Sequence, residues 1–286
     1  MQPRAADTPD SEAFWADPPW RAGRTPFRMG LTRLDRAAWL CEPITAGERE
    51  RKLSLMARGG RAVTDVVAGC EAQDQAVAAA VAAELAARPA FAASQPRQPA
   101  GLAEVALWVP EDLCLLAPSA SGYRLLAASL CAPSFWRLQE KIGRPMHGVH
   151  GAVKGLNEAV GSYVARFFER LEVGEVFQRR NWNLHRTFRR FHPQPEVWPA
   201  SLGVTDCAGL CMRSETQTLR KFGDGALLFT IRVRRFPLGE IRAYPDAVTD
   251  LLAAVSALSD DERQATVFSR HGETLVRYLR GLLASG

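Results

Sequence analysis

The chain has 286 residues, of which 47% are hydrophobic and 23% charged, and this is the composition of an ordinary globular protein with enough length to bury a substantial core. No apolar stretch is long enough to span a bilayer, because even the alanine-rich run Ala76–Pro89 contains charged residues. The acidic N-terminus argues against a signal peptide, so we expect a cytoplasmic protein.

The arginine and cysteine content indicates which ligands, metal sites and redox groups the chain can hold. The net charge is +5, and only four of the 36 basic residues are lysines, which favours bidentate contacts with carboxylate or phosphate groups. Cys207 and Cys211 are four positions apart, but no second pair or downstream histidine completes a zinc pattern, so we expect reduced core thiols. The sequence has no glycine-rich dinucleotide motif and no ferredoxin-type cysteine spacing, so electrons for any redox reaction would come from another protein.

The first third of the chain is predicted to be mainly helical. Residues 1–25 are polar and contain proline, which favours an arm that packs on the body without regular structure, and residues 26–286 are expected to form a single domain. Asp35 is placed to cap a short helix beside Trp39. Helices are also predicted over Gly47–Arg58, which ends at two glycines, and over about Asp74–Arg88, which ends at a proline.

The pattern changes to that of strands from residue 105 onward. Val105–Val109 is a short apolar run, Asp112–Ala117 and Tyr123–Cys131 are typical of a hairpin, and Val176–Leu184 is typical of a further strand. Between the hairpin and that strand, apolar residues from 156 to 171 recur on one face of a helix.

The clearest alternation covers residues 208–234 and predicts an antiparallel hairpin around an Asp-Gly turn. Its first strand places Arg213, Glu215 and Gln217 on one face. A cation, an anion and an amide in a row are costly inside a core unless they pair with one another or meet a ligand, and both interpretations are open.

Helices over Asp246–Leu258 and Asp260–Leu283 are predicted to close the chain. The predicted class is therefore α+β, with a helical N-terminal layer, a mostly antiparallel sheet of about five or six strands, one helix inserted between strands, and C-terminal helices. A sheet with an inserted helix makes a natural pocket between the two.

The stretch Glu140–Gly155 is where a buried cofactor ligand is expected. His147 and His150 lie there between a basic segment and several glycines, and glycine lets the backbone approach a bulky group closely. Neutral imidazole is the commonest metal ligand in proteins. No further ligands follow at metal-site spacing, so a structural role for these histidines is the alternative.

A second candidate site mixes arginines with aromatic residues between Arg179 and Arg190. Such a mixture can bind single-stranded nucleic acid, because bases stack on aromatic rings and phosphates pair with arginine. The alternatives are a strand with solvated arginines and a set of arginines that face the carboxylates of a cofactor.

Seven short motifs follow one another in the order found in one known family. They are PFRMGL (26–31), EDLCLL (111–116), YRLLAASL followed by APSFW (123–136), EKIGRP with VHGAVKG (140–155), RNW (180–182), RSETQTLRKF (213–222) and ALLFTIRVRRFPL (226–238). In this order they resemble the haem-dependent oxidative N-demethylase alpha subunit, over about residues 26 to 280.

The resemblance implies a PAS-like sheet that holds haem b. It also implies a monooxygenase-type oxidoreductase that demethylates a small secondary or alkyl amine, such as dimethylamine, with dioxygen. Electrons would come from NADPH through flavin and iron–sulfur groups on separate reductase subunits. The histidine motif of the family falls on residues 149–155, which makes His150, rather than His147, the expected iron ligand, although Ala152 and Lys154 replace the two prolines of that motif.

The remaining expected roles follow from the needs of such a site. Arg213, Glu215 and Gln217 are the expected catalytic residues: the arginine would stabilise dioxygen or pair with a propionate, the glutamate would attract a substrate ammonium or relay protons, and the amide would orient either. Arg180 and Trp182 are expected to bind the cofactor together with the histidines, with Trp182 as a wall of the pocket or as part of the core.

Two other classes of function stay open from the sequence. A PAS-like fold also serves in haem or small-ligand sensors without turnover. A haem-free protein could instead bind nucleic acid or a partner through the Arg179–Arg190 stretch, and salt-sensitive binding without visible absorbance would favour that function. Nucleic acid is not an expected partner, and no membrane partner is expected.

Overall fold

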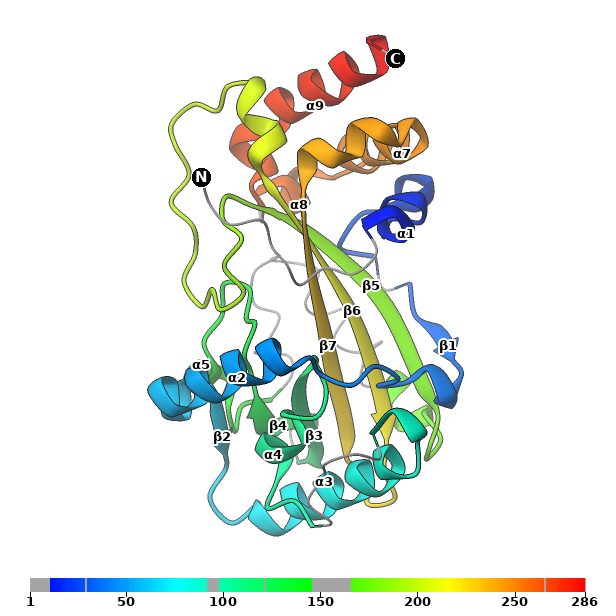
Figure 1. The fold of residues 1–286 in the computed structure, drawn as a ribbon, viewed down its shortest axis with the longest axis vertical. Coiled ribbons are helices and arrows are strands. Elements are labelled where there is room, and N and C mark those ends of the chain that lie inside the picture. The colour runs from blue at the N-terminus through cyan, green and yellow to red at the C-terminus, as the bar shows by residue number, and fades with distance from the viewer. Residues whose placement is uncertain are drawn as a thin grey trace.

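The computed structural model describes residues 11–28, 30–91, 98–120, 122–145, 166–264 and 266–285, and every structural statement below concerns these residues. They form a single antiparallel sheet with helices at both ends of one of its faces (Figure 1). The α+β class is therefore confirmed.

Seven strands make up the sheet, in the spatial order β1-β5-β6-β7-β3-β4-β2. The strands are β1 (Thr32–Leu34), β2 (Thr64–Val66), β3 (Asp112–Ser119), β4 (Gly122–Ser129), β5 (Val176–His185), β6 (Cys211–Lys221) and β7 (Leu227–Pro237). When the five long strands are numbered among themselves, their order is 2-1-5-4-3, which is the order of a PAS-like sheet. The two short strands extend this sheet at its edges.

The described helices are α1 (Ser11–Ala16), α2 (Ala46–Gly59), α3 (Glu71–Ala86), α4 (Leu102–Val105), α5 (Leu138–Lys141), α7 (Pro245–Ser256), α8 (Asp260–Gln264) and α9 (Phe268–Ala284). In the chain, α1 precedes the first strand, α2 to α5 lie between strands, and α7 to α9 follow the last strand. Within the described part of the chain, no helix has both the length and the apolar character needed to cross a membrane.

Both predicted hairpins are confirmed. β3 and β4 pair around Gly122, which has a φ of 93°, and β6 and β7 pair around Gly225, which has a φ of 80°. In the second turn the Oδ1 atom of Asp224 accepts a hydrogen bond from the backbone N–H of Ala226 at 3.0 Å. The Asp-Gly signal in the sequence therefore places this turn correctly.

Strand alternation gives the long sheet two faces with different composition. We call face A the face that carries Arg213, Glu215 and Gln217, and face B the face that carries Trp182 and Thr218.

Face B is covered by helices at both of its ends (Figure 1). At one end α3 and α4 pack on the sheet in a cluster that includes Trp39, whose indole N–H donates to Thr218 Oγ1 at 3.0 Å. At the other end α1, α7 and α9 form a second cluster around Trp15, Trp20 and Trp182. The two clusters therefore hold two helical layers at opposite ends of the same face of the sheet.

A buried lysine joins α2 to the segment that precedes β3. Lys52 has no exposed surface, and its ammonium group donates to the carbonyls of Ala106, Val109 and Glu111 at 2.9, 3.0 and 2.6 Å. All three of its N–H groups are thus used.

Face A meets both ends of the connection between β4 and β5. Leu138 in α5 and Phe168 and Leu171 near the end of the connection lie in one apolar cluster with Leu116 and Leu219 of the sheet. An isolated bridge also pairs Val173 with Lys221. The described residues on either side of the gap between Pro145 and Arg166 therefore include Leu138 and Phe168, which pack on face A.

Four predictions of the sequence need correction. The apolar run Val105–Val109 is not a strand, because it begins as the last residue of α4 and continues as a turn. The predicted closing helix Asp260–Leu283 is two helices, since Arg263 turns back to donate to the carbonyls of Leu258, Val255 and Ser256 at the end of α7. The sheet has seven strands rather than five or six, and the N-terminal arm contains the short helix α1. Most of the predicted helix over 156–171 lies outside the described residues, although 166–170 are helical.

Candidate functional site

The polar row of β6 is the centre of the candidate site. The carboxylate of Glu215 accepts from Arg213 Nε at 3.1 Å and from Gln217 Nε2 at 2.8 Å, and Arg213 Nη2 lies 3.0 Å from the same carboxylate. Arg213 is 2% exposed, while the other two are partly buried. The three side chains therefore pair with one another, as the sequence allowed, and still present polar atoms on face A.

Neighbouring strands extend the row sideways. β5 places Arg179 beside Gln217 and Asn181 beside Glu215, and β7 places Ile231 and Val233 on the other side. Burial lowers the pKa of Arg179, and the charge of Glu215 opposes that change. Among the described residues, Arg213 Nη1, Arg179 Nε and Asn181 Oδ1 are buried without a hydrogen-bond partner. The row thus has unused donors and an unused acceptor next to an apolar strip.

A histidine that the sequence analysis did not single out lies at one end of this face. His185 ends β5, is 1% exposed, stacks on Phe135 with ring centroids 4.5 Å apart, and lies 3.2 Å through Nε2 from Ser134 Oγ. Burial, followed by the nearby positive charge of Arg213, lowers the pKa of His185 to about 3. Phe135 has a φ of 62°, which is uncommon for an aromatic residue. The sequence carries no local signal for this arrangement.

The two histidines expected to hold a cofactor, His147 and His150, lie outside the described residues. Among the described residues nearest to them in the chain, Pro145 forms an isolated bridge with Arg124 of β4, and Leu138 and Phe168 pack on face A. Their role as ligands remains a prediction.

Arg180 and Trp182 lie on face B and not beside the Arg213 row. Arg180 pairs with Asp17 at 2.7 Å, and the indole N–H of Trp182 donates to the carbonyl of Arg24 at 3.2 Å inside the C-terminal cluster. The structure does not bring these two residues together with the row, because the sheet separates them.

The arginines between 179 and 190 do not form one surface. Arg179 and Arg180 point to opposite faces, Arg186 donates to the carbonyl of Val197, and Arg190 is buried against Glu48 at 2.6 Å. A continuous basic strip is what single-stranded nucleic acid requires. The nucleic-acid alternative therefore loses its main support.

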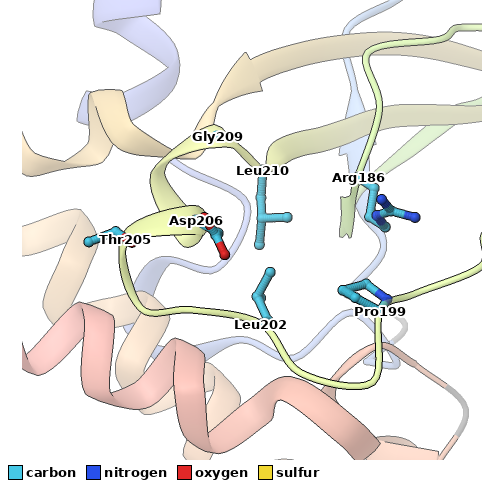
Figure 2. A pocket seen from close by; sticks show the side chains of 7 residues that line it. All are labelled: Arg186, Pro199, Leu202, Thr205, Asp206, Gly209 and Leu210. Carbon is cyan, nitrogen blue, oxygen red and sulfur yellow. The ribbon is translucent and has the colours of Figure 1, made fainter.

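A surface hollow of about 460 Å³ lies away from the row (Figure 2). Its walls come from Arg186 and from the segment between Pro199 and Leu210, where Leu202 and Leu210 face each other. The carboxylate of Asp206 in this wall already accepts from the backbone of Gly203 at 3.0 Å. The hollow is wide open, and Arg186 is the one residue of the Arg179–Arg190 stretch that lines it. None of the residues of the Arg213 row lines it.

The sequence model of the family described as haem-dependent oxidative N-demethylase, alpha subunit-like, matches residues 71–275. The chain belongs to this family. No curated protein matches the chain closely enough to be counted as a relative. The matched span of this N-demethylase-like chain includes β3 to β7, the Arg213 row and both histidines of the 140–155 stretch.

The residues of face A suit the haem that the family name implies. Ala132, Ile231 and Val233 form a small apolar cluster there, with Phe229 beside it, as a flat apolar ring requires. Arg213 lies beside Ala132 of this cluster, and Arg179 lies on the same face two strands away from Ile231. The guanidinium nitrogens of both that have no partner among the described residues can pair with carboxylates. Within the described residues no three His, Cys, Asp or Glu side chains gather into a metal-binding group, but a haem iron needs only one axial side chain from the protein.

Substitution of Trp182 tests whether this residue stabilises the hydrophobic core or contacts the cofactor. Trp182→Phe removes the hydrogen bond to Arg24 and part of the buried ring, so we expect the free energy of unfolding to fall by about 1–2 kcal/mol. Denaturant unfolding measures that change. The visible spectrum of haem-loaded protein should stay the same, and a shifted spectrum would instead give Trp182 contact with the cofactor.

Proposed function

We propose that this chain is a haem b-dependent oxidative N-demethylase-like oxidoreductase that acts on a small secondary or alkyl amine, such as dimethylamine, with dioxygen. Together with the family membership, one structural observation supports the proposal most strongly. The polar row Arg213–Glu215–Gln217 lies on the sheet face on which Leu138 and Phe168 pack, and these two described residues precede and follow His147 and His150 in the chain.

We propose that His150 would hold the haem iron, with His147 as the residue to compare. When bound, the haem would supply the dioxygen chemistry. On the described part of face A, Ile231 and Val233 would pack against the ring, and Arg179 or Arg213 would pair with its carboxylates.

Glu215 is the proposed group for binding and deprotonating the amine. Its carboxylate is held by Arg213 on one oxygen and by Gln217 on the other, so its position is fixed before the substrate arrives. An alkyl ammonium ion would bind near this anion and lose a proton to one of its oxygen atoms, which leaves the amine neutral for oxidation. Gln217 would orient the carboxylate, and the neighbouring valine and isoleucine would exclude water.

The proposal includes a partner. An alpha-subunit-like chain implies other subunits, and this sequence has no flavin, nicotinamide or iron–sulfur motif of its own. We propose that electrons arrive from NADPH through separate reductase subunits in the cytoplasm.

The deciding experiment is an absorption spectrum of the purified protein after addition of haem, first oxidised and then reduced under CO. Wild type is compared with His150→Ala and His147→Ala. We expect a Soret band that shifts with CO in wild type and in His147→Ala, and that is lost or altered in His150→Ala. A wild type that takes up no haem contradicts the proposal.

Turnover separates an enzyme from a sensor. With an NADPH-dependent reductase and dimethylamine, we expect formaldehyde release by wild type and its loss in Glu215→Gln, which keeps the size of the side chain but removes the base. Reversible CO binding without formaldehyde from any alkylamine tested would instead favour a haem sensor.

A further inference from the structure

The cross-strand partner of Arg213 lies where β7 continues beyond β3. The register of β3 with β7 begins at Asp112 opposite Ile231, so Arg235 has no β3 neighbour. Its cross-strand partner is Arg213 on the adjacent strand β6. The chain segments around residues 131–135 and 188–192 run alongside this free edge and are joined by a bridge between Ser134 and His192.

Guanidinium groups from four different parts of the chain meet at this edge. Arg235 donates to the carbonyl of Phe188, and Arg190, which follows in the same segment, pairs with Glu48 of α2 at 2.6 Å. Arg51, one turn along α2, lies 3.7 Å from the same carboxylate.

Arg51 and Arg213 also approach adjacent carbonyls. Arg51 Nη1 donates to Cys131 O at 3.3 Å, and Arg213 Nη2 donates to Ala132 O. Together, Arg51, Arg190, Arg213 and Arg235 form what we call the four-arginine cluster.

The arginines of the cluster repel one another. Burial lowers the pKa of Arg235 to about 10, and the positive charges of Arg190, Arg213 and Arg51 contribute to that change in the same direction. Even with this lower pKa, the guanidinium of Arg235 stays protonated at neutral pH. Within the described part of the chain, Glu48 and Glu215 supply only two carboxylates to the four guanidinium groups. The cluster therefore keeps an excess of positive charge partly or fully out of water, which is costly unless a further anion offsets it.

Two nitrogens in the cluster also have no acceptor within the described residues. Arg213 uses Nε and Nη2 for Glu215 and Ala132, but its Nη1 is buried without a partner although the residue is only 2% exposed. The Nε atom of Arg51 is in the same state, and the side chain of Arg51 is 30% exposed, so the cluster has access to solvent.

We propose that the four-arginine cluster binds an oxyanion of the carboxylate or phosphate type. The guanidinium fork matches two oxygens of such a group, and its charge offsets the repulsion within the cluster. Two sources can supply the group: a small free anion, or a carboxylate of the haem, and only the second source rests on the proposed function.

The first arm of the test uses protein without haem. Melting temperatures are measured in sodium phosphate, in sodium acetate and in sodium chloride of equal ionic strength, for wild type, Arg51→Gln and Arg235→Gln. A free oxyanion site predicts that the wild-type melting temperature rises by roughly 3 °C for each tenfold increase in phosphate or acetate above its Kd, relative to chloride. Both variants should lose most of this rise.

Arg58→Gln is the matched control for this arm. It removes the same charge from the same helix, at an exposed position whose side chain contacts only the carbonyl of Ser54 among the contacts described for it. It should keep the wild-type response, because general screening of charge would act on it equally.

The second arm compares haem b with its dimethyl ester, in which both carboxylates are blocked. If the haem supplies the anion, wild type binds haem b more tightly than the ester, and Arg51→Gln and Arg235→Gln reduce that ratio toward one, as read from the Soret band during titration. The proposal is overturned if no oxyanion raises the wild-type melting temperature above chloride and the variants keep the wild-type ratio of haem to ester. If the wild type binds no haem at all, the proposed function fails, and the first arm alone decides the anion site.

Discussion

Replacement of Lys52 by methionine is expected to lower the free energy of unfolding by about 3–5 kcal/mol. The ammonium group of this fully buried lysine is shared among three backbone carbonyls of the turn that leads into β3. Burial lowers the pKa of Lys52, while the charges of Asp112 and Glu111 oppose that change, so a cation is held here at the cost of its hydration. Methionine keeps the length of the side chain but leaves three carbonyls without donors.

Denaturant unfolding at neutral pH measures this effect, with Arg49→Met as the control. Arg49 lies on the same helix but is exposed, so its replacement should change stability by no more than about 0.5 kcal/mol. Equal stability of Lys52→Met and wild type would show that the carbonyls find other donors and that the lysine is dispensable.

A second large effect is expected from acid, through His185. Its pKa in the folded protein is lowered to about 3 by burial and then by the charge of Arg213, whereas the unfolded chain has the ordinary histidine value near 6.5. The unfolded state therefore takes up a proton first as the pH falls. The stability that His185 contributes is complete above about pH 6.5 and is lost progressively toward pH 3, at about 1.4 kcal/mol per pH unit.

His185→Gln removes this dependence. The variant loses the ring that stacks on Phe135, so it should be less stable than wild type at pH 7.5 by about 1 kcal/mol. Its curve of unfolding free energy against pH should then be shallower by about 1.4 kcal/mol per unit between about pH 6 and pH 4, so that the two proteins converge and cross. Parallel curves for wild type and variant would mean that His185 is protonated in the folded state as readily as in the unfolded one.

Local patterns in the sequence were enough for the long strands and for most helices. The hairpin of β6 and β7 follows from strict alternation and an Asp-Gly turn, both of which act within a few residues. The prediction of a strand at Val105–Val109 was wrong, because five consecutive apolar residues show no period and fit a buried turn as well as a strand. The edge strands β1 and β2 have three residues each, too few to show a period, and form through pairing with β5 and β4.

Local sequence patterns predicted only part of the candidate site. Alternation along one strand placed Arg213, Glu215 and Gln217 together, because that relation is local. The assignment of Arg180 and Trp182 to the cofactor came from a motif, and a motif does not say which face of a strand each residue occupies. The other contacts depend on the tertiary fold, because they join residues that are far apart in sequence. His185 lies against Ser134, and Arg51 and Arg213 donate to the adjacent carbonyls of Cys131 and Ala132.

The buried tryptophans near the N-terminus determine how much of the chain is needed for a stable molecule. Trp15, Trp20 and Trp39 are at most 1% exposed, yet all three precede the span 71–275 that matches the family. Each indole ring covers roughly 200 Å² of apolar surface, and at about 25 cal/mol per Å² the three together represent on the order of 15 kcal/mol. This gross contribution is as large as the upper end of the net stability of a typical domain, about 5–15 kcal/mol. A fragment limited to the matched residues would keep the sequence pattern that identifies the family. It would lose these three tryptophans and the buried apolar surface that stabilises the sheet.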